Sequence, residues 1–374
     1  MRLAHKRDSI TWLAAALRGE SPIWPFGREP ADIEWIIKVA QTEGVTGLLL
    51  AGLSRHADPS GVPPALVPAL QHCIRHESAV ELSREIELEH VLSLLAQAGL
   101  NPLIIKGTAL AYTLYDAPHL RSRCDTDLLF PDRASAEQAW KVLERMGYHR
   151  PAMRGEFISH EFGCHRTDRL KVGHVLDIHW KFSNSPIFAN TLTFQELAAA
   201  AEHIPALSPH ARGLGPAHAM LLACMHRIAH IKGGVGNRLI WLYDIHLLTG
   251  RFTPADWAQF ANTATRFGLC GICLDGLMIT QCQFSTAIPR HSVDTLRTGS
   301  ASEWLTPKLV ANDIGQLYAD IRSLPTWQGR MLLLRDKLFP DADYMMEQYQ
   351  TTHAWRLPLL YLHRLFNEIL RRIR

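Results

Sequence analysis

The chain has 374 residues, of which 47% are apolar and 20% are charged. This length is sufficient for two or three domains with a sizeable core, and the composition excludes a wholly disordered, collagen-like or low-complexity protein. The formal net charge is only +3, so net charge alone predicts no polyanionic partner.

Residues 1–98 have the apolar spacing of α-helices. Trp35, Ile36 and Val39, for example, recur at the intervals that place side chains on one face of a helix. No motif of reactive side chains stands out in this stretch. The sequence therefore predicts an N-terminal helical region over residues 1–98.

The pattern changes after residue 98, where strand and helix patterns alternate. The first strand candidate is a short apolar run rich in β-branched residues, and the third is bounded by Trp180. The predicted strands and helices are, in chain order, 103–105, 108–115, 125–130, 134–146 and 172–180. This alternation predicts an α/β core in which helices cover a small mixed sheet.

Helical spacing returns after roughly residue 190 and continues to Arg374. Leu221, Met225 and Ile228 lie on one stripe of this pattern. No internal repeat or long linker interrupts it. We therefore expect three regions: N-terminal helices over 1–98, an α/β core over 99–205 and a C-terminal helical domain over 206–374.

The cysteines and the hydropathy of the sequence indicate the cellular compartment of the protein. Seven cysteines, an odd number at irregular spacing, favour reduced thiols over a disulfide framework. The first residues combine basic and apolar side chains but lack the small-residue cleavage pattern of a signal peptide. No apolar run approaches the roughly 18 residues of a membrane span. We therefore expect a cytoplasmic protein with no membrane partner.

Three aspartates fall on two of the predicted strands. Asp125 and Asp127 stand two positions apart, so their carboxylates project from one face of a strand. Asp177 lies on a later strand and shares its face with Val175 and His179. Carboxylate oxygens are hard ligands that suit Mg²⁺, and two metals can clamp the attacking and leaving oxygens of an in-line displacement. The three acids therefore predict metal-assisted phosphoryl-group chemistry.

A glycine stands at a strand-to-helix junction upstream of the acid pair. Gly107 follows Ile105 and Lys106 and precedes Thr108, where the helical pattern starts. Backbone N–H groups at such a turn, and the helix N-terminus, can accept a phosphate. A glycine also leaves room for the phosphate and permits a positive φ. We therefore expect the turn and the acids to be neighbours.

His226 and His230 are four residues apart on a predicted helix, the spacing of two ligands in zinc hydrolases. Position 227 is arginine, however, whereas the H-E-x-x-H motif needs a glutamate base there. The other positions of the helix are apolar, so packed or hydrogen-bonded histidines are expected. A role in lining a nucleotide or acceptor cleft stays open.

The segment IIKGTALAYTLYDAPHLRSRCDTDLLF, followed by LERMGY and HVLDIHW, resembles the DNA polymerase β-type nucleotidyltransferase superfamily. The signature of that superfamily is a Gly-containing turn between strand and helix, then Asp-x-Asp, then a third Asp on a later strand. The chain is most similar to a bacterial group of uncharacterised nucleotidyltransferases, which also shows an apolar-Lys-Gly turn, an Arg four residues before the first Asp and an Asp-x-His-Trp strand. One departure is Gly107-Thr108, where the superfamily usually has Gly-Gly or Gly-Ser.

The resemblance implies a role for each matching residue. Asp125 and Asp127 would bind the metals, and Asp177 would complete the metal site or act as a base toward the acceptor hydroxyl. Strand alternation alone would make Lys106 a surface lysine at the end of the sheet, whereas the resemblance implies that it neutralises phosphate charge. The residues that the resemblance assigns to nucleotide binding are Lys106, Gly107, Thr108 and Arg121.

These observations predict a nucleotidyltransferase that uses Mg²⁺ or Mn²⁺ to transfer an NMP from an NTP to a hydroxyl or phosphate. The acceptor, whether a small molecule, a peptide or protein, or RNA, is not defined by the sequence. One alternative is nucleotide-dependent transfer of a phosphoryl or sugar group in the tailoring of a peptide or other natural product. Another is a nucleotide-binding scaffold without turnover, against which the presence of all three acids argues.

Overall fold

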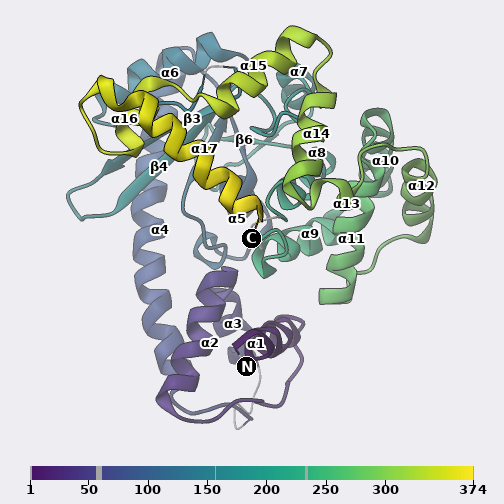
Figure 1. The fold of residues 1–374 in the computed structure, drawn as a ribbon. Helices are drawn as coiled ribbons and strands as arrows, with labels where there is room; N and C mark the ends of the chain where they lie inside the picture. The colour runs from purple at the N-terminus through teal and green to yellow at the C-terminus, as the bar shows by residue number, and fades with distance from the viewer. Residues whose placement is uncertain (1, 56–60, 156, 232–234, 374) are drawn as a thin grey trace.

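A computed structural model describes residues 2–55, 61–155, 157–231 and 235–373. It contains a six-stranded mixed sheet with helices from both ends of the chain around it (Figure 1). The expected α/β core with flanking helical regions is confirmed.

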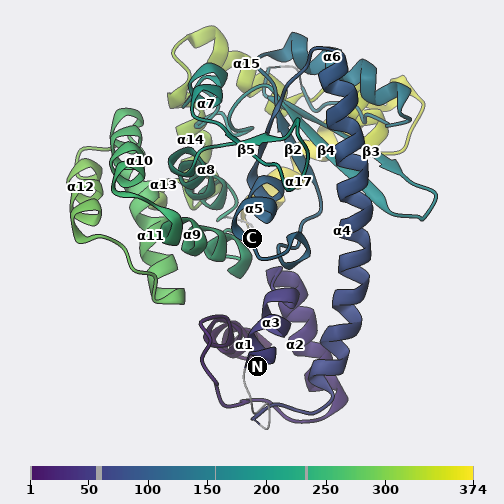
Figure 2. The same ribbon diagram turned by 180° about the vertical axis from the view of Figure 1, so that it is seen from behind.

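The N-terminal helices form a group of their own at one end of the molecule. They are α1 (Arg2–Leu17), α2 (Pro30–Glu43), α3 (Thr46–Ser54) and α4 (Leu66–Gln97). The 32-residue helix α4 runs from this group to the sheet (Figure 2). Leu13, Ile36 and Leu49 share a core with Leu239 and Ile240, so the N-terminal helices also pack against a C-terminal helix.

None of the described helices is by itself long and apolar enough to cross a membrane. Helices α2 and α3 reach that length and composition only as a pair, and the chain bends by 117° between them. Ile36 and Leu49 of this pair are fully buried inside the protein.

The sheet has the strand order β3-β4-β2-β1-β6-β5. Its strands are β1 (Leu103–Ile105), β2 (Thr126–Leu129), β3 (Glu161–Thr167), β4 (Gly173–His179), β5 (Glu202–His203) and β6 (Arg212–Gly213). β2 and β4 run parallel, as do β1 and β6, and the other neighbours are antiparallel. The three predicted strands correspond to β1, β2 and β4. The sheet itself continues beyond residue 205, because β6 pairs with β1.

Alternation along the strands divides the sheet into two faces. Ile104 and Leu128 point to the face that α4 and α6 cover, where they share a core with Leu88 and Leu143. Side chains one position away point to the opposite face, where Leu103, Ile105 and Leu129 pack against α8 and neighbouring helices. Asp127 and Asp177 belong to this second face because they alternate with Leu128 and Leu176.

Short helices connect the strands of the core. They are α5 (Lys106–Leu114), the 3₁₀ helix η2 (Pro118–Leu120), α6 (Arg133–Arg145) and α7 (Phe194–Ala199). Helix α6 begins where the side chain of Asp132 accepts a hydrogen bond from the Ser135 N–H, and its apolar stripe, which includes Ala139, is buried. The chain leaves α6 through Gly147, whose φ of +86° is a left-handed conformation that glycine adopts without strain.

The remainder of the chain is helical. The helices are α8 (Pro216–Ala229), α9 (Leu239–Arg251), α10 (Pro254–Phe267), α11 (Cys270–Phe284), α12 (Arg290–Ser300), α13 (Pro307–Val310), α14 (Asp313–Ser323), α15 (Trp327–Leu338), α16 (Ala342–Gln348), η4 (Ala354–Arg356) and α17 (Leu357–Ile373). Helices α8 to α11 pack on one another, and their buried residues share one hydrophobic core with Leu103, Ile105 and Leu129 of the sheet. Cys224, Cys270 and Cys273 are buried in this core, and all seven cysteines are free, as the sequence predicts.

Candidate active site

Asp127 and Asp177 lie side by side on adjacent parallel strands. The register of β2 and β4 pairs Asp127 with Asp177 and Leu129 with His179, so these side chains share one face of the sheet. One ligand atom from each of Asp127, Asp177 and His179 lies within 4.8 Å of the other two. This spacing allows one divalent cation to contact all three side chains. The structure therefore brings together two of the three expected acids, with His179 as their third neighbour.

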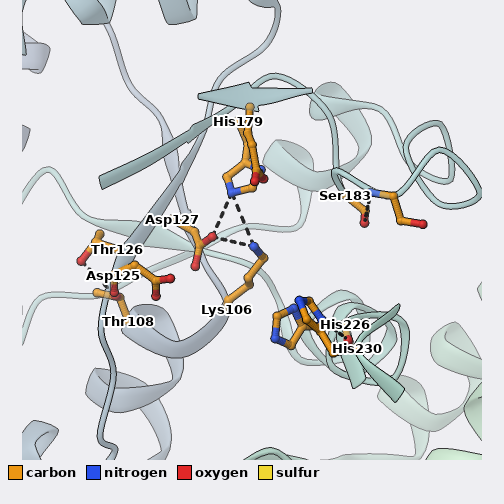
Figure 3. A network of polar contacts seen from close by, with 11 residues as sticks. Lys106, Thr108, Asp125, Thr126, Asp127, His179, Ser183, His226 and His230 are labelled. Carbon is orange, nitrogen blue, oxygen red and sulfur yellow. Dashed lines mark hydrogen bonds and ion pairs between the residues drawn. The ribbon is translucent and has the colours of Figure 1, made fainter. Parts of the chain in front are cut away.

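Asp125 lies just outside this group. It precedes β2, is partly exposed and lines the same cavity as Asp127. Figure 3 shows its carboxylate on the same side of the strand as that of Asp127. Burial and the negative charge of Asp127 raise the pKa of Asp125 above its usual value. The two carboxylates of the Asp-x-Asp pair therefore affect each other electrostatically.

Asp127 is held by two cationic side chains. Its Oδ1 lies 2.6 Å from Nζ of Lys106 and 2.8 Å from Nε2 of His179 (Figure 3). On the other side of the imidazole ring, Nδ1 of His179 lies 2.9 Å from Oε2 of Glu161 on β3. Lys106 is therefore not a surface lysine, as strand alternation alone would make it, but belongs to a chain of four charged groups.

Lys106 reaches Asp127 because its backbone turns sharply between β1 and α5. Its φ is +55°, a left-handed conformation that costs a residue with a side chain about 1–2 kcal/mol. The glycine next to it does not have this conformation, since a positive φ is found at Lys106 and not at Gly107. The turn therefore does not use the positive φ that a glycine would permit at position 107. Strain of this kind persists where the surroundings hold it, and it clusters at functional sites.

The charges of the site shift the pKa values of its members in opposite directions. Burial would raise the pKa of Asp127, but Lys106 and His179 outweigh burial and hold this pKa below its usual value. Burial and the negative charges of Asp127 and Glu161 raise the pKa of Asp177 to about 7. Burial and Lys106 oppose protonation of His179, yet the carboxylates of Asp127 and Glu161 raise its pKa to about 9. Near neutral pH, protons on His179 and Asp177 thus offset the negative charge of the clustered carboxylates. A bound divalent cation could offset the same negative charge instead.

Gly107 is needed for the close approach of Arg121. A Cβ atom at position 107 would lie 3.0 Å from Nη1 and 3.2 Å from Cζ of Arg121. The guanidinium cannot easily move aside, because its Nε and Nη2 donate to the carboxylate of Asp244 at 3.0 and 2.6 Å. Tyr115 donates a further hydrogen bond to Asp244 at 2.6 Å. Arg121 therefore lines the cavity with a charge that Asp244 already balances.

Thr108 directs its side chain away from the cavity. Its buried hydroxyl lies 3.2 Å from Oγ1 of Thr126, to which Arg123 also donates at 2.8 Å. Arg123 in turn forms an ion pair of 2.6 Å with Glu81 on α4. These contacts leave the backbone N–H of Thr108, rather than its hydroxyl, as the group that could meet a phosphate.

A cavity of about 290 Å³ opens in front of Asp125 and Asp127, whereas Asp177 is not among its lining residues. Lys106, Gly107, Asp125 and Asp127 line one side of it. The other side is formed by α8 and α9, and its residues include His226, His230, Arg238, Trp241 and Asp244. The two histidines whose role the sequence left open therefore line the same cavity as Asp125 and Asp127.

Sequence reasoning missed two residues of the site. Glu161 lies on β3, a strand that was not predicted, although Phe162 and Cys164 alternate with polar residues there. Arg238 lines the cavity at the start of α9, and within the described residues its Nε has no hydrogen-bond partner. No local signal marks Arg238, because its place depends on the packing of α9 against the core.

Comparison with known protein families agrees with this geometry. A family model described as uncharacterised nucleotidyltransferase matches residues 29–285, which is more than half of the chain and includes every site residue described above. No curated protein sequence gives a significant match. Because this match spans more than half of the chain and includes the paired aspartates, the chain belongs to the family of uncharacterised nucleotidyltransferases, which are transferases of phosphorus-containing groups.

Proposed function

We propose that the protein transfers an NMP from an NTP to a hydroxyl or phosphate oxygen of an acceptor, in a reaction that depends on Mg²⁺ or Mn²⁺. The acceptor oxygen forms a bond to the α-phosphorus, the bond from that phosphorus to the bridging oxygen of the β-phosphate breaks, and pyrophosphate leaves. The observation that carries this proposal is the register of Asp127 with Asp177 beside a cavity that also holds Lys106.

The carboxylates of Asp125, Asp127 and Asp177 would hold the metal ions. The donor set fits, because carboxylate oxygens suit Mg²⁺ and Mn²⁺, and the imidazole of His179 is close enough to join them. Bound metal would neutralise phosphate charge and orient the reacting oxygens. Asp177 would complete this metal site or, alternatively, act as a base toward the acceptor hydroxyl.

The turn between β1 and α5 would bind the phosphates. The backbone N–H groups of Gly107 and Thr108 lie in the first turn of α5, where helix N–H groups are free to donate and the helix dipole favours anions. Lys106 would exchange its contact with Asp127 for the phosphates once metal balances the carboxylate. Asp244 keeps Arg121 in place beside the cavity, where the guanidinium would donate a hydrogen bond to a phosphate.

The substrates of this reaction are an NTP and an acceptor of one of three classes, namely a small molecule, a peptide or protein, or RNA. An assay with each NTP labelled at the α-phosphate, with Mg²⁺ or Mn²⁺ and a panel of the three classes, measures both label transfer and pyrophosphate. Chelation of the metal should abolish both signals.

Substitution of the acids tests the same proposal. Asp127→Asn and Asp177→Asn each keep the shape of the side chain but remove its charge, so we expect loss of transfer by at least about a hundredfold with the circular dichroism spectrum retained. The matched control is Asp116→Asn, at a carboxylate that is 86% exposed and pairs with Arg55 on the surface. Wild-type turnover in the Asp127 variant would contradict catalysis by this site.

A further inference from the structure

We propose that His226, His230 and Trp241 form the binding site for the base of the NTP. These three residues are called the aromatic wall below. The inference rests on the proposed function, in which the acids and the β1–α5 turn bind the triphosphate. The base is the part of the NTP for which those groups provide no binding site.

The rings of the aromatic wall pack directly on one another. The centroid of His226 lies 4.4 Å from that of His230 and 4.6 Å from that of Trp241, and His230 lies 5.4 Å from Trp241. His226 lies in the last turn of α8, His230 directly follows that helix, and Trp241 lies on α9. All three line the cavity, so the cluster forms a ring-rich surface on a substrate-sized space.

The aromatic wall stands across the cavity from the reacting groups. Figure 3 shows His226 and His230 on a helix apart from the strand that carries Asp127, with Lys106 between them. If the triphosphate lies against Lys106 and the first turn of α5, the sugar and base must extend away from α5. The opposite side of the same cavity is the aromatic wall.

Planar rings suit a nucleobase because every base has a π-face that stacks on aromatic side chains. The wall also offers polar recognition at its edge. Nδ1 of His230 lies 2.9 Å from the carbonyl oxygen of His226, which fixes Nδ1 as the donor. In the neutral ring Nε2 is then a hydrogen-bond acceptor, suited to an exocyclic amino group of a base.

The experiment separates the base from the phosphates. Calorimetric titration of the full chain with Mg²⁺ and ATP, GTP, CTP or UTP gives the affinity of each nucleotide, and titration with inorganic tripolyphosphate gives that of the phosphate chain alone. Trp241→Ala should weaken the best-bound NTP by roughly 5- to 150-fold, the range expected for loss of one base-stacking contact. Its affinity for tripolyphosphate should stay at the wild-type value.

Further variants control for folding and for loss of a tryptophan. Trp241→Phe keeps an aromatic face and should bind the NTP within about threefold of wild type, whereas Trp241→Leu should resemble Trp241→Ala. This pair answers the question even if the alanine variant does not fold. Trp327→Ala removes a tryptophan that is 67% exposed on α15 and does not line the cavity, so it should bind like the wild type.

Two results would overturn the assignment of the wall while leaving the proposed function intact. One is an NTP affinity that is equal in wild type and in the folded Trp241 variants. If transfer falls in those variants while the NTP affinity is unchanged, the aromatic wall binds the acceptor and not the base. The other is an equal loss of affinity for NTP and tripolyphosphate. Failure of the wild type to bind any of the four NTPs would instead contradict the proposed function itself, and with it the assignment of the wall.

Discussion

Asp127 is the residue on which the other charged groups of the site converge. Lys106 and His179 contact the same oxygen, Oδ1, and Glu161 contacts the far side of the imidazole. Removing one member of such a buried set leaves its partner uncompensated, which costs more than the contact itself contributes. The arrangement therefore keeps Asp127 ionised and ready for a cation, at the cost of a strained backbone at Lys106.

The burial of the His226 side chain beside the cavity can be tested through the pH dependence of stability. Burial, helped by the positive charge of Lys106 and by His230, holds the pKa of His226 well below its usual value. The folded protein therefore keeps His226 neutral at a pH where the unfolded chain takes up a proton. This contribution to stability is complete above about pH 6.5 and is lost as the pH falls toward the folded pKa, by about 1.4 kcal/mol per pH unit.

The free energy of unfolding should depend less on pH in His226→Gln than in the wild type. Between pH 6.5 and 5, we expect its slope to be smaller by up to about 1.4 kcal/mol per pH unit. Urea unfolding at several pH values measures it, since the free energy of unfolding is obtained at each pH. His210→Gln, which removes an exposed imidazole outside the cavity, is the control. Parallel curves for wild type and His226→Gln would contradict a buried, neutral His226.

At the scale of single residues, the sequence shows which side chains are charged but not which of them form ion pairs. Asp125, Asp127 and Asp177 could be singled out because strand alternation and their order along the chain are local properties. The partner of Arg121 could not, because Asp244 lies 123 residues away on a helix whose packing is a tertiary property. The left-handed backbone of Lys106 was also unpredictable, since glycine next to it is the residue that favours this conformation.

At the scale of elements, the contact between Arg121 and Asp244 joins the segment before β2 to α9. Both side chains are buried, and two N–H groups of the guanidinium donate to the carboxylate. A buried pair of this kind holds its elements together mainly because neither charge can be left alone. It also fixes the side of the cavity on which α9 carries Trp241.

We expect Asp244→Asn to lower the free energy of unfolding by about 3–5 kcal/mol, because it leaves the guanidinium of Arg121 buried without its counter-charge. Asp116→Asn breaks an exposed contact of 3.6 Å with Arg55 and should change stability by less than about 1 kcal/mol. Chemical denaturation of both variants measures the difference. Equal, small effects would show that Arg121 does not depend on Asp244.

The elements that the sequence predicts best are those with a strong period. β1, β2, β4 and α6 follow from apolar runs, alternation or an amphipathic stripe with a cap and a terminal glycine. β3 was missed because it is an edge strand in which only Phe162 and Cys164 are buried. β5 and β6 have two residues each, so they are too short for any periodic signal.

At the scale of the whole molecule, the cavity exists because helices from the C-terminal part pack on the face of the sheet that carries the acids. Leu103, Ile105 and Leu129 share one core with Met220 and Leu221 of α8, which brings α8 and α9 over the site. Composition and periodicity predict helices in this part but not this placement. The family match covers the sheet together with α8 to α11, so the whole cavity lies within the matched region.

The central claim is that the α-phosphorus of the NTP is the atom attacked in this cavity. Parallel reactions with α-labelled and γ-labelled samples of the same NTP, with Mg²⁺ and the acceptor panel, test it directly because they show which phosphorus stays with the acceptor. The account predicts that the α-label enters the acceptor, that the γ-label is recovered in pyrophosphate, and that Asp127→Asn abolishes both. Transfer of the γ-label to the acceptor, with a nucleoside diphosphate released, would contradict it.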